Sequence, residues 1–234
     1  MAERRQPAVP GTQPVHVGHY ARRLVIMAKE PIAGRVKTRL ARDIGVVPAT
    51  WFYRHNLATV TSRLSRDPRW QTLFSVAPAS ATTSRCLPSA VPRIAQQAGD
   101  IGARMQAIFD RAAPGPVVVI GTDIPTVRPS HIAAAFQALG DSDIVFGPAT
   151  DGGFWLVGLR RTPRVLNAFH DVRWSTPDTL RDCLEGIGCM PSIRIATIAM
   201  LQDADERADL DLLKAAIGRR IAPSSACSKL EVNY

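Results

Sequence analysis

Short apolar runs that alternate with helical segments limit the folds open to this chain more than any other feature of its sequence. The clearest run is VVVIG at 117–121, and similar runs occupy 24–28, 72–77, 143–147 and 154–159. Apolar runs of this length are typical of strands buried on both faces of a sheet. Helices are expected between and after them, at 37–44, 49–64, 101–112, 129–139, 176–187 and 206–217. The order predicts an α/β fold whose mostly parallel central sheet carries helices on both faces.

The domain organisation follows from where this alternation begins and ends. Residues 1–23 are rich in Pro, Gly and charge and lack an apolar period, so we expect a flexible N-terminal extension. Residues 218–234 are weakly patterned and are expected to form a C-terminal tail. The 194 residues between them show no internal repeat and suffice for one domain. One domain over 24–217 is therefore predicted, with a further strand near 193–200.

Charge and cysteine content narrow the functional class. The chain carries 29 Lys and Arg against 20 Asp and Glu, a net charge of +9, which raises the question of an anionic partner. Its five histidines show no paired ligand spacing, and its four cysteines form no CxxC pair. Neither a zinc site nor a disulfide framework is indicated, and reduced thiols in the cytoplasm are expected. No apolar run reaches the ~18 residues that span a bilayer, so no membrane partner is expected.

The loop after the first apolar run concentrates positive charge. It reads Lys29-Glu30-Pro31-Ile32-Ala33-Gly34-Arg35-Val36-Lys37-Thr38-Arg39. Four cations beside a glycine and a helix start suit an anion with several charges, such as a di- or triphosphate. The spacing matches neither a Walker A loop nor a G-x-G-x-x-G fingerprint. A solvated basic turn is the alternative reading.

Carboxylates follow two later strands. Asp123 comes after the strand at 117–121, and in an open α/β sheet that position borders the ligand site. Mg²⁺ is usually held by one or two carboxylates and substrate phosphates, which favours a metal role over a helix cap for Asp123. Asp151, in the Asp151-Gly152-Gly153 turn, is expected to bind an acceptor hydroxyl or act as a base, unless the turn is only a hairpin.

Two further segments admit structural readings. The stretch Trp174-Ser175-Thr176-Pro177-Asp178 resembles a helix start, and core packing is the expected role of Trp174. Acids at 203, 205 and 206 precede the last expected helix, where negative charge is favoured in any case. Neither segment alone indicates a ligand site.

Together these residues resemble the bacterial DUF2064 family of the GT-A, or nucleotide-diphospho-sugar transferase, superfamily. The resemblance rests on Met27–Leu40, Gly121–Pro125, Asp143–Gly158 and Asp203–Leu210, and Gln97, Gly99, Asp100, Gly102, Arg104 and Met105 match the family's middle segment. Phe154 stands where tyrosine is usual, and Glu206-Arg207 stands where Thr-Pro is usual.

The resemblance implies a single-domain GT-A (Rossmann-like) fold and an enzyme that uses a nucleotide and Mg²⁺ or Mn²⁺. Asp123 and Asp205 would hold the metal, and Lys37, Arg39, Asp123 and Asp151 would act in catalysis. The nucleotide would be bound by Ala28, Lys29, Gly34, Arg35, Lys37, Thr38, Arg39, Thr122, Gly152 and Gly153.

The expected reaction is nucleotidyl transfer from an NTP to a small phosphorylated or hydroxylated acceptor, with release of pyrophosphate. A glycosyltransferase that uses a nucleotide-diphospho-sugar donor is the main alternative. A nucleic-acid-binding module lacks aromatic platforms, zinc spacing or an RNP-type strand, so no nucleic-acid partner is expected. A catalytically inactive nucleotide-binding protein and a homodimer both stay open.

Overall fold

The computed structural model describes residues 21–162 and 165–202. The strands are β1 (Arg23–Lys29), β2 (Gln71–Ala77), β3 (Arg93–Ala95), β4 (Gly115–Ile120), β5 (Ile144–Pro148), β6 (Phe154–Arg161) and β7 (Ile195–Thr197). The α-helices are α1 (Thr38–Ile44), α2 (Val46–Leu64), α3 (Ile101–Arg111), α4 (Pro129–Asp141) and α5 (Thr179–Gly188), and a 3-10 turn, η1, covers Ala79–Thr83. The predicted strands and helices within this part of the chain are all present, with shifted ends.

All seven described strands join one sheet in the order β3-β2-β1-β4-β6-β5-β7. Neighbours from β3 to β4 are parallel, β6 is antiparallel to both β4 and β5, and β7 is parallel to β5. The mostly parallel α/β prediction is therefore confirmed. The exception is the hairpin of β5 and β6, which the Asp-Gly-Gly turn joins.

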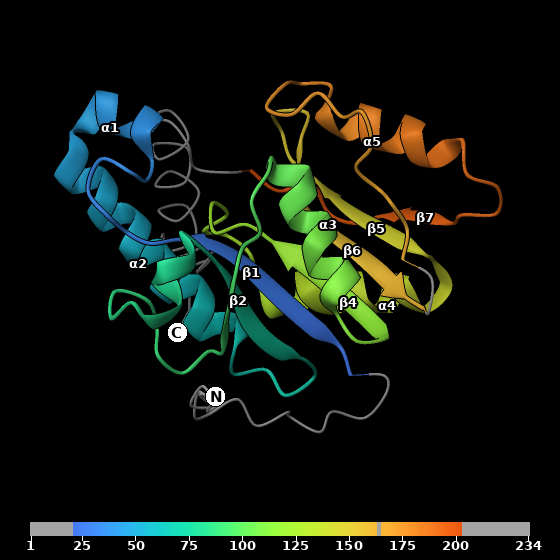
Figure 1. Ribbon diagram of the computed structural model, residues 1–234, viewed down its shortest axis with the longest axis horizontal. Helices are drawn as coiled ribbons and strands as arrows, with labels where there is room; N and C mark the ends of the chain where they lie inside the picture. The colour runs from blue at the N-terminus through green and yellow to red at the C-terminus, as the bar shows by residue number, and fades with distance from the viewer. Residues whose placement is uncertain (1–20, 163–164, 203–234) are drawn as a thin grey trace, which may run out of the picture.

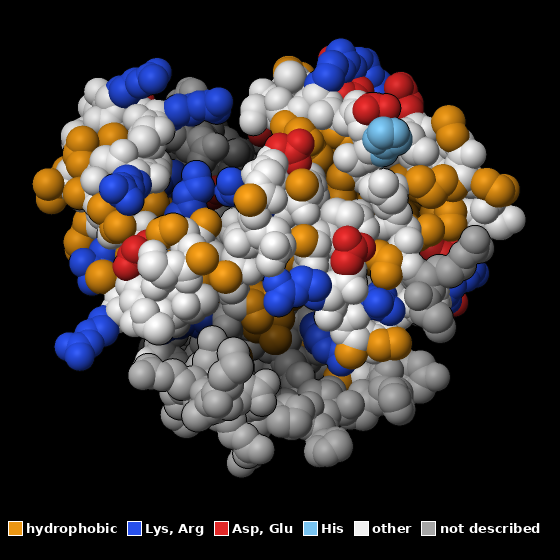
Figure 2. Space-filling model, viewed as in Figure 1, with side chains coloured by type: hydrophobic (Ala, Val, Ile, Leu, Met, Phe, Trp, Pro, Cys, Tyr) orange, Lys and Arg blue, Asp and Glu red, His pale blue; other side chains and the backbone are white. Residues whose placement is uncertain are grey.

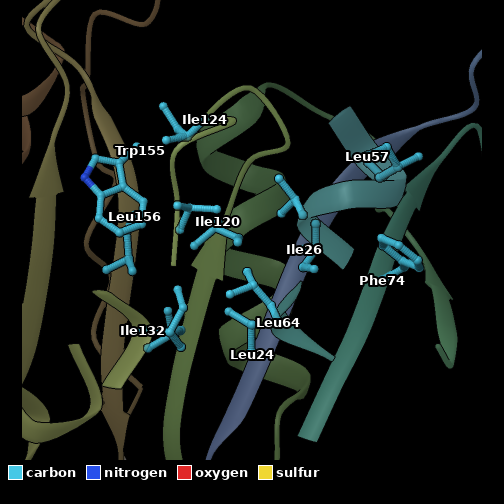
Figure 3. Packing of buried hydrophobic residues seen from close by; sticks show 14 of the residues in the cluster. Leu24, Ile26, Leu57, Leu64, Phe74, Ile120, Ile124, Ile132, Trp155 and Leu156 are labelled. Carbon is cyan, nitrogen blue, oxygen red and sulfur yellow. The ribbon is translucent and has the colours of Figure 1, made fainter. Parts of the chain in front are cut away.

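Helices cover both faces of the sheet (Figure 1). Leu24 and Ile26 of β1 point to one face, where they pack with Leu57 and Leu64 of α2 and Ile132 of α4 (Figure 3). Val25, between them, points to the other face, into a cluster that contains residues of α3 and α5. This alternation is the period of a strand, and both faces are apolar because both are covered.

Three features of the fold differ from the predicted pattern or lie outside it. β3 and η1 were not predicted, because three residues at a sheet edge and one short turn leave no measurable period. α5 begins at Thr179 rather than near residue 176, because residues 174–178 form turns and a bend before it. The predicted helix at 206–217 lies outside the described residues, as do residues 1–20 of the predicted extension and the whole predicted tail.

The carboxyl ends of β1, β4 and β5 lie along the same edge of the sheet, because these three strands run in one direction. The antiparallel strand β6 begins at that edge. The loops after β1 and β4 and the β5–β6 turn are therefore brought together, as the strand order predicts for a ligand site.

Candidate active site

A cavity of about 510 Å³ opens at this edge of the sheet. It is within the range of small-molecule sites. Ten of the predicted site residues line it: Ala28, Lys29, Arg35, Lys37, Thr38, Arg39, Thr122, Asp123, Asp151 and Gly153. Gly34 and Gly152 are not found among the described lining residues, and Asp205 lies outside the described part of the chain.

An ion pair between Lys37 and Asp123 lies on the wall of this cavity. Nζ of Lys37 is 2.6 Å from Oδ1 of Asp123, and it joins the loop after β1 to the loop after β4. The lysine side chain is only 5% exposed, whereas the aspartate side chain is 45% exposed. A buried ammonium requires a charged or polar partner, so the pair holds Lys37 in the cavity wall.

The backbone of Lys37 is unusual as well. Its dihedral angles (φ 48°, ψ 46°) are those of the left-handed region, at the position that caps α1. For a residue other than glycine this conformation costs about 1–2 kcal/mol. Such strain persists where the surrounding structure imposes it, and it is found more often at functional sites.

Other cations lie on the same side of the cavity. Lys29, Arg35 and Arg39 line it from β1, the following loop and α1. Figure 2 shows Lys and Arg side chains gathered around the α1 side of the hollow. Within the described residues no ion pair is seen for these three side chains. Cations close together without carboxylates repel one another, and an anionic ligand would relieve that repulsion.

Helix α2 fixes the two loops that carry this charge. The Tyr53 hydroxyl donates to the Lys29 carbonyl at 3.0 Å and accepts from the Lys29 amide at 2.8 Å. Burial raises the pKa of the Tyr53 phenol, so the hydroxyl keeps its proton for this bond. Three residues on, the Asn56 amide donates to the Thr122 carbonyl at 2.5 Å.

Sequence reasoning missed both Tyr53 and Asn56. The available signal was two polar side chains three residues apart on the apolar face of a helix, where an unpaired polar group is costly. Gln96 was missed too. It lines the cavity just after β3, and its amide nitrogen donates to the Ser75 carbonyl at 2.7 Å.

The β5–β6 turn forms the opposite part of the wall. The Gly153 amide donates to Oδ1 of Asp151 at 2.9 Å, which orients that carboxylate. Gly152 has φ +86°, and a Cβ there would lie 2.1 Å from the Pro177 carbonyl oxygen. The Leu180 amide donates to the Gly152 carbonyl at 3.0 Å. Gly152 therefore permits close contact between the turn and the start of α5.

Aromatic side chains stand next to this turn. Trp174 and Phe154 both line the cavity, with ring centroids 6.3 Å apart in an edge-to-face arrangement. The ring centroids of Trp174 and Phe169 are 5.9 Å apart, and Trp174 is partly buried against the apolar cluster that contains residues of α3. The core-packing role expected for Trp174 is thus observed, and the ring borders the cavity as well.

The described residues hold no group of three or more His, Cys, Asp or Glu side chains close enough to bind a metal ion. Asp123 is the carboxylate that opens into the cavity beside the cations. It fits the mode in which one carboxylate and substrate phosphates hold Mg²⁺ together. Among the described helices, none combines the length and the apolar character that crossing a membrane requires.

A family model described as "Uncharacterized protein conserved in bacteria (DUF2064)" matches residues 59–176, which is half of the chain. The chain belongs to the DUF2064 family. The predicted membership is confirmed, and the matched span contains the loop with Asp123 and the turn with Asp151. No match is found among curated proteins.

Solved structures share the fold of this DUF2064 chain. One from Desulfovibrio desulfuricans G20, provisionally described as a nucleotide-diphospho-sugar transferase, is 27% identical over 88% of this chain and 90% of its own, with a TM-score of 0.76. The inositol-1-phosphate CTP transferase from T. maritima is 14% identical over 90% of this chain and 99% of its own, with a TM-score of 0.58.

A third structure with this fold contains ligands. It is glucosyl-3-phosphoglycerate synthase from Mycobacterium tuberculosis, in complex with Mn²⁺, UDP and phosphoglyceric acid. It is 12% identical over 84% of this chain and 74% of its own, with a TM-score of 0.50. The predicted GT-A-type fold is thus confirmed, and these three structures are named as transferases or as a synthase that is bound to UDP.

Proposed function

We propose that this DUF2064 protein is a metal-dependent transferase that acts on an activated nucleotide, and that it transfers a nucleotidyl group from an NTP to a small acceptor. The observation that carries the proposal is the convergence of Lys29, Arg35, Lys37 and Arg39 on the cavity that Asp123 borders. A triphosphate has the charge that such a group of cations neutralises. Its pyrophosphate would leave with stabilisation from the same side chains.

Lys37 and Asp123 would change partners when the nucleotide binds. In the structure they pair with each other at 2.6 Å. The ammonium group would turn to the phosphates, to which it can donate up to three hydrogen bonds. The released Asp123 carboxylate would hold Mg²⁺ or Mn²⁺, and Asp205 is the predicted second ligand. When bound, the metal would supply charge neutralisation and polarise the phosphate oxygens.

The remaining predicted residues would position the reactants. Arg35 and Arg39, on the exposed side of the loop, would contact the terminal phosphates. The backbone of Ala28 and that of Lys29, whose amide and carbonyl are hydrogen-bonded to Tyr53, would contact the nucleoside part. Asp151, oriented by the Gly153 amide, would bind the acceptor hydroxyl and direct its oxygen for in-line attack.

Glycosyl transfer from a nucleotide-diphospho-sugar is the second candidate. It is favoured by the 27% identity to the Desulfovibrio structure, whose provisional description is a nucleotide-diphospho-sugar transferase. The same cations would then bind the diphosphate of the leaving group. The two reactions differ in the bond that breaks and in the product that is released.

Product analysis separates the two candidates. The full chain is incubated with Mg²⁺, an acceptor mixture and either each NTP or each of several nucleotide-sugars. Nucleotidyl transfer releases pyrophosphate from an NTP, whereas glycosyl transfer releases a nucleoside diphosphate from a nucleotide-sugar. If neither product forms and no nucleotide raises the melting temperature in the presence of Mg²⁺, the proposed function is wrong.

Substitution of Asp123 tests the site itself. We expect Asp123→Ala to reduce activity by about 10³-fold or more, because the metal and its phosphates lose their carboxylate. Asp123 is half-exposed but is the ion-pair partner of the buried Lys37 ammonium, so the free energy of unfolding should fall by about 1–3 kcal/mol and the chain should still fold. Activity is measured by product release and stability by urea denaturation. Retention of metal-dependent activity would show that Asp123 is not the metal ligand.

A further inference from the structure

The two ends of the cavity differ in charge. We name as the cationic end Lys29, Arg35, Lys37 and Arg39, and as the aromatic end Asp151, Phe154, Trp174, Ser175 and Thr176. Among the described residues, the β5–β6 turn and the segment 174–179 contribute no Lys or Arg to the lining. Arg104, the remaining described cation of the lining, also borders a small void with Ser75 and Gln96 on the β2–β3 side of α3.

The aromatic end is held rigidly. A Cβ on Gly102 would lie 2.3 Å from Cζ2 of Trp174, so the indole lies directly against the backbone of α3. Phe154 and Phe169 contact the same ring from β6 and from the segment before α5. The indole is thus fixed by three elements and still borders the cavity, which is the arrangement of a prepared apolar contact surface.

Three polar residues line the cavity together with that indole. Asp151 presents a carboxylate whose direction the Gly153 amide sets. Ser175 is exposed and has φ 61°, a left-handed conformation rare for serine. Thr176 donates its hydroxyl to the Arg173 carbonyl at 2.9 Å and accepts from the Asp178 amide at 3.3 Å, so its oxygen is oriented and can only accept from a ligand. A carboxylate and two hydroxyls beside an apolar ring suit a ligand that has both hydroxyl groups and an apolar face.

We infer that the aromatic end is the acceptor subsite and that it takes an uncharged, polyhydroxylated ring compound, such as a neutral sugar or cyclitol. This inference rests on the proposed function. The carboxylate of Asp151 would accept a hydrogen bond from an acceptor hydroxyl but would repel an acceptor phosphate. Trp174 would pack against the apolar face of the ring.

The transfer step balances with the groups named. The acceptor hydroxyl oxygen forms a bond to the α-phosphorus of the NTP, and the bond from that phosphorus to the bridging oxygen breaks. Pyrophosphate leaves with the electron pair, and the hydroxyl proton passes to Asp151. With a nucleotide-sugar donor, the same oxygen bonds to the anomeric carbon and a nucleoside diphosphate leaves.

Paired acceptors test the inference. Glucose and glucose 6-phosphate, glycerol and glycerol 3-phosphate, and inositol and inositol 1-phosphate are each offered to the full chain with Mg²⁺ and its active nucleotide. In at least one ring pair, we expect the neutral member to be used with a kcat/KM about tenfold higher than that of its phosphorylated partner. A preference for the phosphorylated members would overturn the inference. So would a failure of every member to react while nucleotide binding persists, and that outcome would leave the proposed nucleotide site standing.

Variants of Trp174 give a second measurement. We expect Trp174→Ala to raise the KM of the neutral acceptor about tenfold while the KM of the nucleotide stays unchanged, and Trp174→Phe to recover most of the loss. Trp51→Ala is the matched control, since Trp51 is 67% exposed on α2 and does not line the cavity. The stabilisation of each variant by nucleotide reports that it folds. An equal rise in both KM values would assign Trp174 a structural role only and would contradict the subsite.

Discussion

The positive charges of the cationic end and those around α5 are arranged in opposite ways. Arg173 contacts both Asp178 and Asp182, and Arg181 contacts Asp178 and Glu185. Figure 2 shows red and blue side chains side by side over α5. At the cationic end, no ion pair is seen for Lys29, Arg35 or Arg39 within the described residues. Paired arginines fix the segment behind the aromatic end, whereas the cationic end is left to bind an anion.

This difference separates positive charge that serves structure from positive charge that serves a ligand. Around α5, carboxylates of the chain neutralise the arginines, so these cations require no anionic ligand. The Lys37–Asp123 pair combines both arrangements, because it is closed in the structure and would open in the proposed complex. Substitutions at the two ends should therefore affect different measured quantities.

The largest effect is expected for Lys37→Ala. Loss of the ammonium group should lower kcat/KM by about 10²–10³-fold, because a preorganised charge is removed from the leaving phosphates. It should also raise the affinity of Mn²⁺ for the nucleotide-free protein, since the Lys37 ammonium no longer competes for Asp123. Steady-state kinetics and Mn²⁺ titration followed by electron paramagnetic resonance measure the two effects.

The control for Lys37→Ala is Arg173→Ala, which removes a cation from the α5 network. That variant should keep its nucleotide affinity and bind Mn²⁺ as the unmodified protein does. If Arg173→Ala lowered the affinity for the nucleotide as much as Lys37→Ala does, the distinction between the two groups of cations would be wrong.

An intermediate effect is expected for Gly102→Ala. The new methyl would lie 2.3 Å from the Trp174 ring, so the ring or α3 must shift, at a cost of about 1–3 kcal/mol in the free energy of unfolding. The KM of the acceptor should rise more than the KM of the nucleotide. Urea denaturation and the two KM values measure this. Gly140→Ala is the matched control, because that helical glycine has no atom within 4 Å of the added carbon, and the control should gain up to about 1 kcal/mol.

The smallest effect is a pH dependence at α5. The hydrogen bond from Arg173 lowers the pKa of Asp182 from its ordinary value of 3.8 to about 2. A lowered carboxyl pKa stabilises the folded chain above the unfolded pKa, and the contribution is lost as the pH falls from 3.8 through about 2. Asp182→Asn should therefore lower the urea midpoint slightly near neutral pH, and the difference should shrink toward pH 2. A difference that is constant across this range would contradict the pKa assignment.

Much of the fold was predictable because buried strands leave short, uninterrupted apolar runs between the helical segments. The loops with Lys37, Asp123 and Asp151 were found by applying the strand-end rule, and the structure brings the three around one cavity. Tyr53 and Asn56 could not be found that way, because they reach the loops from the middle of α2. The antiparallel direction of β6 could be read only from the Asp151-Gly152-Gly153 turn, which admits a hairpin, since an apolar run is the same for both strand directions.

The hairpin of β5 and β6 has a consequence for how this protein family can diversify. Turns that connect strands vary in length and composition among homologues more than the strands that they join. Residues 149–153 form such a turn at the aromatic end. The residues of the cationic end lie on the parallel strand β1, on the loop after it and on α1. A change in this turn would therefore alter the proposed acceptor subsite, while the proposed nucleotide site on β1 and α1 would be left in place.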